Sequence, residues 1–513
     1  MKMPNSRYRW LNWRVVNAHK TNKLMNKLEG HFEKYRKNTI GWDATLTTPY
    51  GEKPLVYADW IASGRLYGPI EDLMKDKIGP MVANTHSESS DTGMIMTNIY
   101  KRSHQIIKKH VNAGSEDIII TAGFGMTYVV NKLQRILGMR VPEQAQQYCN
   151  IPTDQRPVVF LTHLEHHSNH TSWLETNADV VVIEPDDQLL VNPDALRREI
   201  EKYKNRTLKI GSFSACSNVT GVRVNYHELA KIMHENGGFC FVDFAASAPY
   251  DEINMHPGDP LESLDAIFFS PHKFLGGPGS SGVMVFNRSL YHNSAPDNSG
   301  GGTVDWTNRW GMYRYVDDIE AREDGGTPGF LQSIKAALVI ELKEQMGVEN
   351  IHAREDEIIE KVLREFRKIP GMNILANNVD KRLGAISFYI DKLHFNLAVR
   401  LLNDHFGIQV RGGCSCAGTY GHYLLHVSYY TSNKITSKIN HGDLSEKPGW
   451  IRMSIHPTMT DKEVDYLISS VREVAEKWED MMNDYEYVAS HNEYFHKEVP
   501  VKTPEDYNTW FKF

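Results

Sequence analysis

Phe268-Phe-Ser-Pro-His-Lys-Phe-Leu-Gly-Gly-Pro-Gly279 is the stretch that narrows the fold and the chemistry most. It runs from an apolar strand, predicted over Ala266–Ser270, into a histidine, a lysine and a run of glycines. A solvated surface lysine needs neither the strand before it nor the glycines after it. Burial lowers the pKa of a lysine amine and makes it reactive toward carbonyl compounds. The stretch therefore predicts a buried, reactive amine at Lys273.

Apolar runs alternate with helical stretches from about residue 55 to residue 290. The continuous apolar character of the runs is typical of strands that are buried on both faces. Alternation of this kind indicates βα units and a mostly parallel sheet covered by helices. The predicted strands are Ile118–Thr121, Val158–Thr162, Val180–Glu184, Leu208–Phe213, Phe239–Phe244 and Ala266–Ser270, with helices such as Tyr100–Val111 and Tyr226–Glu235 between them.

Three further loops follow predicted strands, and loops at the carboxyl ends of parallel strands form the ligand crevice of such sheets. Thr121-Ala-Gly-Phe-Gly125 opens a helix around Met126–Leu137, so it suits a phosphate or is an ordinary tight turn. The histidines of His163-Leu-Glu-His-His-Ser-Asn169 are surface residues, metal ligands or rings that stack on a cofactor. Asp243 ends an apolar strand, where it either caps a turn or pairs with a cationic ring nitrogen.

The remainder of the chain predicts a second unit. A helix is expected over Phe330–Gln345, a strand over Ala385–Ile390 and a helix over Phe395–Phe406. Thr460 and Glu463 form a capping-box pattern at the start of the last strong helix. We expect four parts: an N-terminal helical segment (1–50, helical over Lys20–Lys37) that packs with the small domain, a large domain (51–330), a small α+β domain (331–483) and an aromatic, polar tail (484–513).

Composition excludes several classes of protein. The 513 residues include 57 Lys and Arg against 64 Asp and Glu, a net charge of −7, so nothing favours nucleic acid as a partner. No apolar run reaches the 18 residues that a membrane span requires, and the first 20 residues lack the apolar core of a signal peptide. Five sparse cysteines do not describe an oxidised scaffold. We expect a cytoplasmic protein.

Four motifs in order carry a resemblance to a known family: EHHSN (165–169), VDFAAS (242–247), SPHKFLGG (270–277) and RGGCSC (411–416). The chain resembles the class V aminotransferase superfamily over roughly residues 55–480, and most of all its cysteine desulfurase and selenocysteine lyase group. The resemblance implies an α/β protein of PLP-dependent transferase fold type I, with a mostly parallel seven-stranded sheet in the large domain and a smaller α+β domain. It also implies pyridoxal 5′-phosphate (PLP) as cofactor, an amino-acid substrate and a homodimer.

The resemblance assigns roles to individual residues. Lys273 matches the lysine that carries PLP, His166 the histidine stacked on its ring, and Asp243 the carboxylate that pairs with its ring nitrogen. Asn218 matches a residue near the phenolic oxygen, and Arg452 matches the arginine that clamps the substrate carboxylate. The phosphate ligands implied are Ser270, His272, the backbone of Gly123 and Phe124, and Thr327 reaching across a dimer interface. One departure is Ala246, where the family often has glutamine.

The cysteine pair in Arg411-Gly-Gly-Cys-Ser-Cys-Ala-Gly418 leaves three alternatives open. Cys416 aligns with the desulfurase cysteine that attacks the substrate sulfur, and Arg411 nearby would favour its thiolate. Cys414, Cys416, His422 and His426 are also compatible with zinc, the two histidines sharing a helix face. In the third alternative, both cysteines are inert residues of the loop. We expect no metal.

The leading expectation for function is a PLP-dependent lyase or transferase that moves sulfur or selenium from an amino acid to Cys416, releases alanine and hands the sulfur to an acceptor protein. The alternative is an aminotransferase, epimerase or C–S lyase acting on another amino acid, which Ala246 and the insertions near 141–156, 295–322 and 427–448 favour. A non-catalytic scaffold is disfavoured because Lys273, Asp243 and Arg452 are all present.

Overall fold

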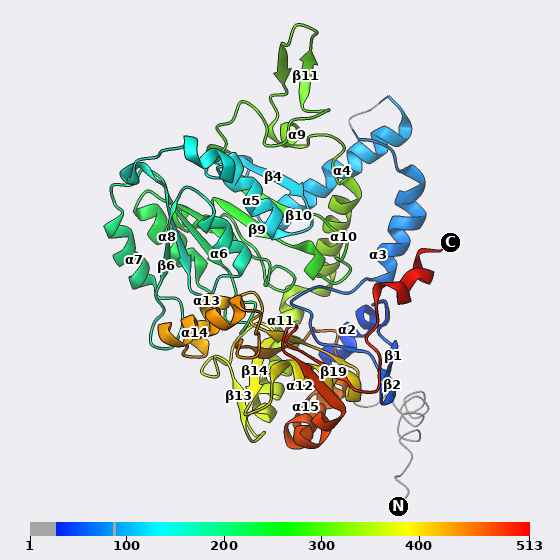
Figure 1. Ribbon diagram of the computed structural model, residues 1–513. Helices are drawn as coiled ribbons and strands as arrows, with labels where there is room; N and C mark the ends of the chain where they lie inside the picture. Colours follow the sequence, from blue (N-terminus) through cyan, green and yellow to red (C-terminus); the bar gives the residue numbers. More distant parts are fainter. Residues whose placement is uncertain (1–26, 86–88, 513) are drawn as a thin grey trace, which may run out of the picture.

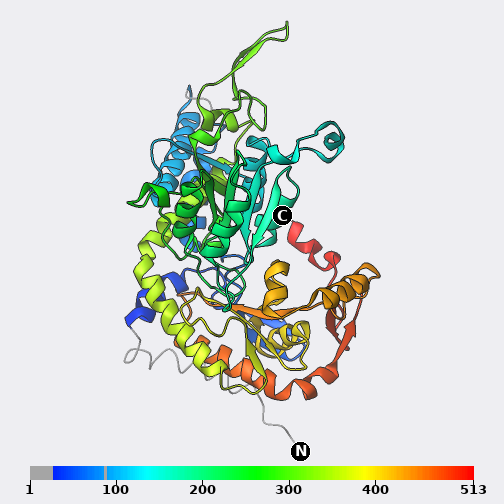
Figure 2. The ribbon, with the colours of Figure 1, turned by 90° about the vertical axis from the view of Figure 1, so that its left-hand side faces the viewer.

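The computed structural model describes residues 27–85 and 89–512, so the first part of the predicted N-terminal helix, 20–26, lies outside the described residues. Figure 1 shows two layered units, one around a seven-stranded sheet and one below it around a four-stranded sheet. The two views together show helices on both sides of the larger sheet (Figure 2).

The larger sheet has the strand order β4-β10-β9-β8-β7-β5-β6, and β10 is antiparallel to both of its neighbours while the other strands are parallel. The predicted mostly parallel seven-stranded sheet is therefore confirmed. The strands are β4 Asp117–Ala122, β5 Val158–Thr162, β6 Asp179–Ile183, β7 Lys209–Ser214, β8 Phe239–Asp243, β9 Ala266–Phe269 and β10 Gly282–Asn287.

Alternate residues of these strands enter two different cores. Phe241 and Phe268 face α5 (Met126–Ile136) and α6 (His167–Leu174), whereas Val242 and Ile267 face the opposite side. Because side chains alternate across a strand, a strand that is apolar throughout needs helices on both faces. The opposite face is covered by α4 Asp91–His110, α7 Pro193–Lys202, α8 Tyr226–Glu235 and α10 Phe330–Met346.

The smaller unit has the antiparallel strand order β13-β14-β17-β16 and its own apolar core. The passage from the first core to the second falls within α11, since Ile351 packs in the first and Ile358 in the second. Its elements are α11 Val348–Phe366, β13 Met372–Ile374, β14 Ala385–Ile390, α12 Phe395–Phe406, β16 Arg411–Gly413, α13 Gly418–Leu424, α14 Tyr429–Asn440, β17 Trp450–Ser454 and α15 Asp461–Met481. Thr460 and Glu463 form the predicted capping box at α15.

The N-terminal segment joins the two units. Helix α2 (Lys27–Lys37) places Tyr35 against α10, where its hydroxyl donates to Gln345 O at 2.6 Å, while Arg36 pairs with Glu463 of α15. After the hairpin β1–β2 the chain reaches β3, which pairs in parallel with β15 of the smaller unit. These strands are β1 Thr45–Thr48, β2 Gly51–Pro54, β3 Val56–Tyr57 and β15 Ile408–Gln409.

Two hairpins lie at the edges of the molecule. The hairpin of β11 (Val304–Thr307) and β12 (Tyr313–Tyr315) projects beyond the larger sheet in both views (Figures 1 and 2). The tail forms β18 (Tyr485–Val488) and β19 (Glu493–His496), and β19 packs on α12. Among the described residues, no helix is long and apolar enough to cross a membrane.

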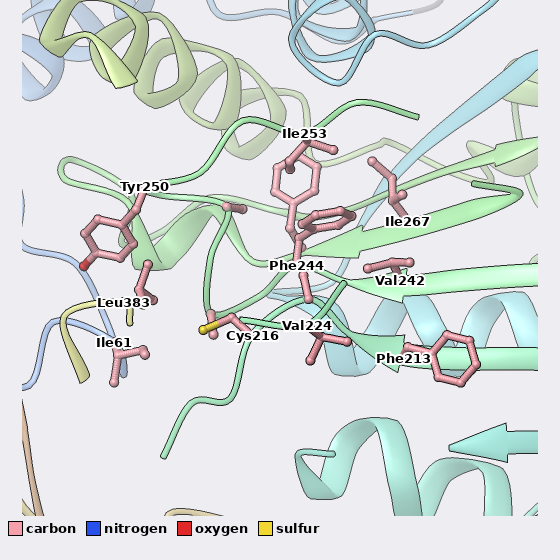
Figure 3. Packing of buried hydrophobic residues seen from close by; sticks show 14 of the residues in the cluster. Ile61, Phe213, Cys216, Val224, Val242, Phe244, Tyr250, Ile253, Ile267 and Leu383 are labelled. Atoms are coloured by element: carbon pink, nitrogen blue, oxygen red, sulfur yellow. The ribbon is translucent and has the colours of Figure 1, made fainter. Parts of the chain in front are cut away.

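The junction between the two units is tightly packed. Figure 3 shows Ile61 and Leu383 beside Cys216 and Tyr250 of the larger unit. Leu383 N donates to Gly221 O at 2.7 Å. Gly221 has φ +71°, and a Cβ there would overlap Leu383 O, so this contact requires glycine. The loop around Gly221 is thereby held against the smaller unit.

Candidate active site

Lys273 lies on a short 3-10 turn, Pro271–Lys273, that directly follows β9. Its backbone N donates to Ser270 O at 3.0 Å, and His272 O accepts from Gly64 N at 2.9 Å. Burial lowers the pKa of the Lys273 amine to about 8, with Arg452 among the charges that act in the same direction and Asp243 opposing it. A large fraction of this amine is therefore neutral, and so nucleophilic, near pH 8.

Asp243 is the last residue of β8 and is buried. Its Oδ1 accepts from Ala245 N at 2.8 Å, and no described residue donates a hydrogen bond to Oδ2 in this structure. Burial raises the pKa of Asp243 to about 7, although the positive charge of Lys273 opposes the change. A buried carboxyl group with one free oxygen is ready to pair with a cation that is brought to it.

His166 caps the N-terminus of α6, and its Nδ1 accepts from Ser168 N at 3.1 Å. Burial lowers the pKa of His166 to about 3, and the charge of Lys273 adds to the effect. The ring is therefore neutral at physiological pH, which suits stacking on an aromatic ring.

Glu165, the residue before this histidine, anchors the turn from below. Its carboxylate accepts from the hydroxyl groups of Thr162 and Ser214, both at 2.6 Å, and from Asn169 Nδ2 at 2.7 Å. These partners come from β5, β7 and α6, so one buried side chain fixes the turn relative to the sheet. The sequence predicted no role for Glu165, and the only signal for one is a carboxylate three residues after the end of an apolar strand.

The start of α5 forms a small cradle with the lysine turn. Met126 N donates to Ser270 Oγ at 2.8 Å. A Cβ built on Gly125 would lie 3.0 Å from Ser270 Oγ and 3.5 Å from the ring of His272, so glycine leaves that space clear. Gly123 has φ +57°, and the side chain of Phe124 is 81% exposed, so Phe124 can contribute only its backbone here. Backbone N–H groups at a helix start favour an anion.

A charged group lies where the smaller unit meets the larger. Arg452 on β17 donates from Nη2 to Asp59 Oδ1 at 2.7 Å, and its buried Nε has no hydrogen-bond partner among the described residues. Arg411 donates from Nε to the other oxygen of Asp59 at 3.1 Å. Asn218 O lies 3.4 Å from Arg452 Nη1. Asp59 was missed from the sequence because its partners are more than 350 residues away.

The loop that carries Cys416 is held on both sides. Ser415 O accepts from Asn218 Nδ2 at 2.8 Å, and Ser415 Oγ accepts from Trp450 Nε1 at 3.1 Å. Ser415 and Cys416 both adopt positive φ, +52° and +56°, which is strained for residues other than glycine. Cys416 is exposed, and it is among the groups that act on the pKa of Arg452. The loop therefore presents a thiol near the arginine group.

Two predicted features lie elsewhere. Thr327 is exposed, and among the described residues its hydroxyl donates to Asn84 Oδ1, at 3.5 Å, and not to Ser270. The prediction that His422 and His426 share a helix face is wrong, because α13 ends at Leu424 and His426 has φ +51°. Instead, Nδ1 of His422 lies 2.7 Å from Gly418 O, and its Nε2 lies 2.9 Å from Ser432 Oγ. Over residues 27–85 and 89–512, no three His, Cys, Asp or Glu side chains are grouped for a metal.

The residues present fit PLP. Asp243 offers a free carboxyl oxygen for a cationic ring nitrogen, and Lys273 offers a partly neutral amine. Asn218 Oδ1 is buried without a hydrogen-bond partner among the described residues, as expected of an atom that would bond to a polar group of a cofactor. The cradle at Gly125 offers room and N–H groups for a phosphate. Four separate features therefore suit the four parts of one cofactor.

Comparison with known proteins identifies the family and the fold. A model of the family described as aminotransferase class V matches residues 56–467. A probable cysteine desulfurase from Staphylococcus epidermidis is 28% identical over 381 residues, covering 72% of this chain and 85% of the relative. Another from Halalkalibacterium halodurans is 26% identical over 370 residues, covering 71% and 84%.

Solved structures share the fold. The apo structure of a cysteine desulfurase from Thermococcus onnurineus NA1 superposes with a TM-score of 0.68 at 22% identity, covering 86% of this chain and 98% of that one. A cysteine desulfurase from Escherichia coli, with its cysteine as S-sulfonic acid, gives a TM-score of 0.66 at 20% identity, with coverage of 88% and 99%. The family match spans well over half of the sequence, and we conclude that the chain belongs to the class V aminotransferase family of enzymes.

Proposed function

We propose that the protein binds PLP and removes sulfur from cysteine, or selenium from selenocysteine, passing it to Cys416 with release of alanine. The observation that carries the proposal is the exposed Cys416 on a loop anchored to Asn218, beside the arginine group of the same crevice. Ordinary aminotransferase chemistry needs no thiol at this place. The named cysteine desulfurases among the relatives support the same choice.

The residues of the chain divide the work. Bound PLP would supply an electron sink, with Asp243 holding its ring nitrogen, His166 lying on its ring, and Asn218 beside its phenolic oxygen. Ser270, His272 and the backbone of Gly123 and Phe124 would hold its phosphate. Arg452 binds the substrate carboxylate with its planar guanidinium group, whose Nε is free in this structure.

Lys273 and Cys416 carry the proton and the sulfur. The Lys273 amine takes the α-proton of the substrate, which a pKa near 8 allows it to do at neutral pH. The Cys416 thiolate attacks the substrate sulfur, so the Cβ–S bond breaks and an S–S bond forms. Cysteine and the thiol thereby give alanine and a persulfide, and a reducing acceptor, such as a partner protein, then removes the outer sulfur.

The test compares two cysteines that lie two residues apart. With L-cysteine and a dithiol reductant, we expect Cys416→Ala to lose alanine and sulfide release by at least about 100-fold while keeping PLP absorbance. Cys414→Ala is the matched control and should keep activity within a few-fold. Mass spectrometry should find one added sulfur atom on the peptide that contains Cys416. Unchanged sulfide release in Cys416→Ala would rule the proposal out.

A second candidate keeps PLP and changes the reaction to an aminotransferase, epimerase or C–S lyase on another amino acid. It is favoured by Ala246, which is 6% exposed and has no side-chain donor where the family often has glutamine. Steady formation of a keto acid from an amino donor, independent of Cys416, would select this candidate. If the amino group of the donor instead stays in the product, as alanine, the aminotransferase is excluded.

We further propose a homodimer that works in the cytoplasm. Thr327 is exposed and bonds Asn84 instead of Ser270, which supports a role for it in a neighbouring subunit. The five cysteines are all free, as suits a reducing compartment. Sedimentation should give twice the chain mass, and Thr327→Ala should weaken PLP retention without changing that mass.

A further inference from the structure

His167 holds the cysteine loop through two separate hydrogen bonds. Its backbone N donates to Cys416 O at 2.7 Å. Its side-chain Nε2 lies 3.0 Å from Gly418 N, the first residue of α13. The bonds fall on either side of Ala417, so one residue fixes both the carbonyl of Cys416 and the point where the loop becomes a helix.

The second bond fixes the protonation state of the ring. A backbone N–H can only donate, so Nε2 of His167 must be the nitrogen without a proton. The imidazole is therefore neutral, with its proton on Nδ1. Burial lowers the pKa of His167, and the positive charge of Lys447 acts in the same direction. Both effects keep the ring in the form that can accept.

The bond has a mechanical consequence because the loop is strained. Ser415 and Cys416 both have positive φ, and such conformations persist only where the surroundings hold them. Asn218 and Trp450 hold the N-terminal side at Ser415, whereas His167 holds the C-terminal side. Loss of the side-chain bond would leave the C-terminal side of the loop held by the bond from His167 N to Cys416 O, without the support at Gly418.

We propose that His167 is a positioning residue that fixes the Cys416 thiol relative to the substrate sulfur, so that the two adjacent histidines have separate tasks. His166 faces the cofactor side and His167 faces the sulfur-accepting side. This inference rests on the proposed function, since a fixed thiol matters only where that thiol reacts. A displacement of about 1 Å can cost about 100-fold in rate when a reacting group is misplaced.

Protonation of His167 should release the loop. A charged imidazole has no acceptor at Nε2, so the bond from Gly418 N is lost as pH falls through the pKa of the ring. The titratable and charged groups around it are the N-cap residue His166, His170 on α6, Lys447, Cys416 of the loop, and His422 on α13. Sulfur transfer should therefore have an acid limb below pH 6.5.

Two substitutions separate positioning from folding. Gln in His167→Gln keeps an oxygen that can accept from Gly418 N and does not titrate, whereas His167→Ala removes the acceptor. We expect His167→Ala to lower kcat for sulfide release by about tenfold, with KM for cysteine within twofold, and His167→Gln to restore most of the loss. His170→Gln is the matched control, because His170 contacts only Thr419 Oγ1 of this loop, at 3.3 Å.

Two readouts distinguish the inference from a general defect and from failure of the proposed function. In the Cys414→Ala background, the pH profile of Cys416 alkylation by iodoacetamide should show an inflection below pH 6.5 that His167→Gln abolishes and His170→Gln keeps. Exchange of the α-proton of L-alanine in deuterated water, which needs Lys273 but not Cys416, should stay within twofold in every His167 variant.

An inflection that persists in His167→Gln overturns the inference, as does a parallel loss of exchange and sulfide release in His167→Ala. The alkylation profile does not depend on desulfurase activity, so it is informative even where Cys416→Ala refutes the function.

Discussion

Lys273 and Asp243 shift each other's pKa, and under the proposed function this balance should set how readily the free protein takes up PLP. Because burial lowers the pKa of Lys273 to about 8, the neutral amine should predominate only above that pH. The rate of PLP capture by the cofactor-free protein should rise with pH and level off above about 8, rather than near the ordinary value of lysine. Stopped-flow absorbance across a pH series measures it.

Neighbouring charges supply the controls for this titration. Asp243 raises the pKa of Lys273, so Asp243→Asn should move the midpoint to lower pH. Arg452 lowers it, so Arg452→Ala should move the midpoint to higher pH. A midpoint that ignores both substitutions would mean that another group is being titrated.

Arg452 should be intolerant of lysine despite the conserved charge. A guanidinium group can bond Asp59 and a substrate carboxylate at once, whereas an ammonium group is a point donor. We expect Arg452→Lys to reduce kcat/KM for the amino acid by about 10–100-fold, mainly through KM. Steady-state kinetics with a Cys416-independent readout, α-proton exchange, measures the substrate step alone.

At the residue scale, strand ends were good guides to the site. Lys273, Asp243 and His166 each lie at or just after the end of an apolar run, and in the structure the charge of Lys273 acts on both of the others. Asp59 and His167 could not be found this way. Their roles depend on contacts with Arg452 and Gly418, and a short stretch of sequence does not reveal contacts between residues so far apart in the chain.

At the scale of elements, the start of α5 depends on a missing side chain. Gly125 has φ 167°, extended backbone that any residue adopts, so a substitution there acts through space alone. Gly125→Ala places a methyl group 3.0 Å from Ser270 Oγ. We expect PLP affinity to fall by about tenfold, while pyridoxal, which lacks the phosphate, is bound nearly unchanged. Equilibrium dialysis with both compounds tests this, and equal losses would place the cradle elsewhere.

The capping box of α15 should contribute measurable stability. The Thr460 side chain accepts from Glu463 N, and the Glu463 side chain accepts from Thr460 N at 2.9 Å. Thr460→Ala should lower the free energy of unfolding by about 1 kcal/mol, and Thr460→Ser by much less. Urea titration of both variants measures the difference. A loss in Thr460→Ser as large as that in Thr460→Ala would assign the effect to the methyl group instead.

Elements themselves were predicted well where periodicity is strong. The helix Phe395–Phe406 and the strand Val158–Thr162 have the bounds expected from sequence. The antiparallel direction of β10 could not be predicted from sequence, because an apolar strand buried on both faces has the same pattern in either direction. The tail hairpin β18–β19 was also missed, since its strands are short and their partly buried side chains show no clean alternation.

For the molecule as a whole, Glu355 is a buried group at the junction of the two units. Neither of its oxygens has a hydrogen-bond partner among the described side chains, and Gly384 of the smaller unit packs against it. Burial raises the pKa of Glu355 to about 8. The unfolded chain loses this proton from about pH 4.5 upward, whereas the folded protein keeps it to about pH 8, so stability falls as pH rises between these values.

Replacing this carboxyl group should remove that loss. We expect Glu355→Gln to be more stable than the parent at pH 8, by about 2–4 kcal/mol relative to the same comparison at pH 5. Urea unfolding at the two pH values measures it, and Glu357→Gln, two residues further along α11 and more exposed, is the control. A difference independent of pH would show that Glu355 does not titrate on unfolding.

The ion pair between Asp59 and Arg452 spans 393 residues of chain, and this separation bears on the order of synthesis. On the ribosome the strands and glycines of the cofactor side emerge long before β17. The ion pair with Asp59, and with it the proposed carboxylate-binding group, can form only after Arg452 has been synthesised. In the nascent chain Asp59 therefore waits for its partner, so the proposed carboxylate-binding group would be assembled after the residues proposed to hold the cofactor.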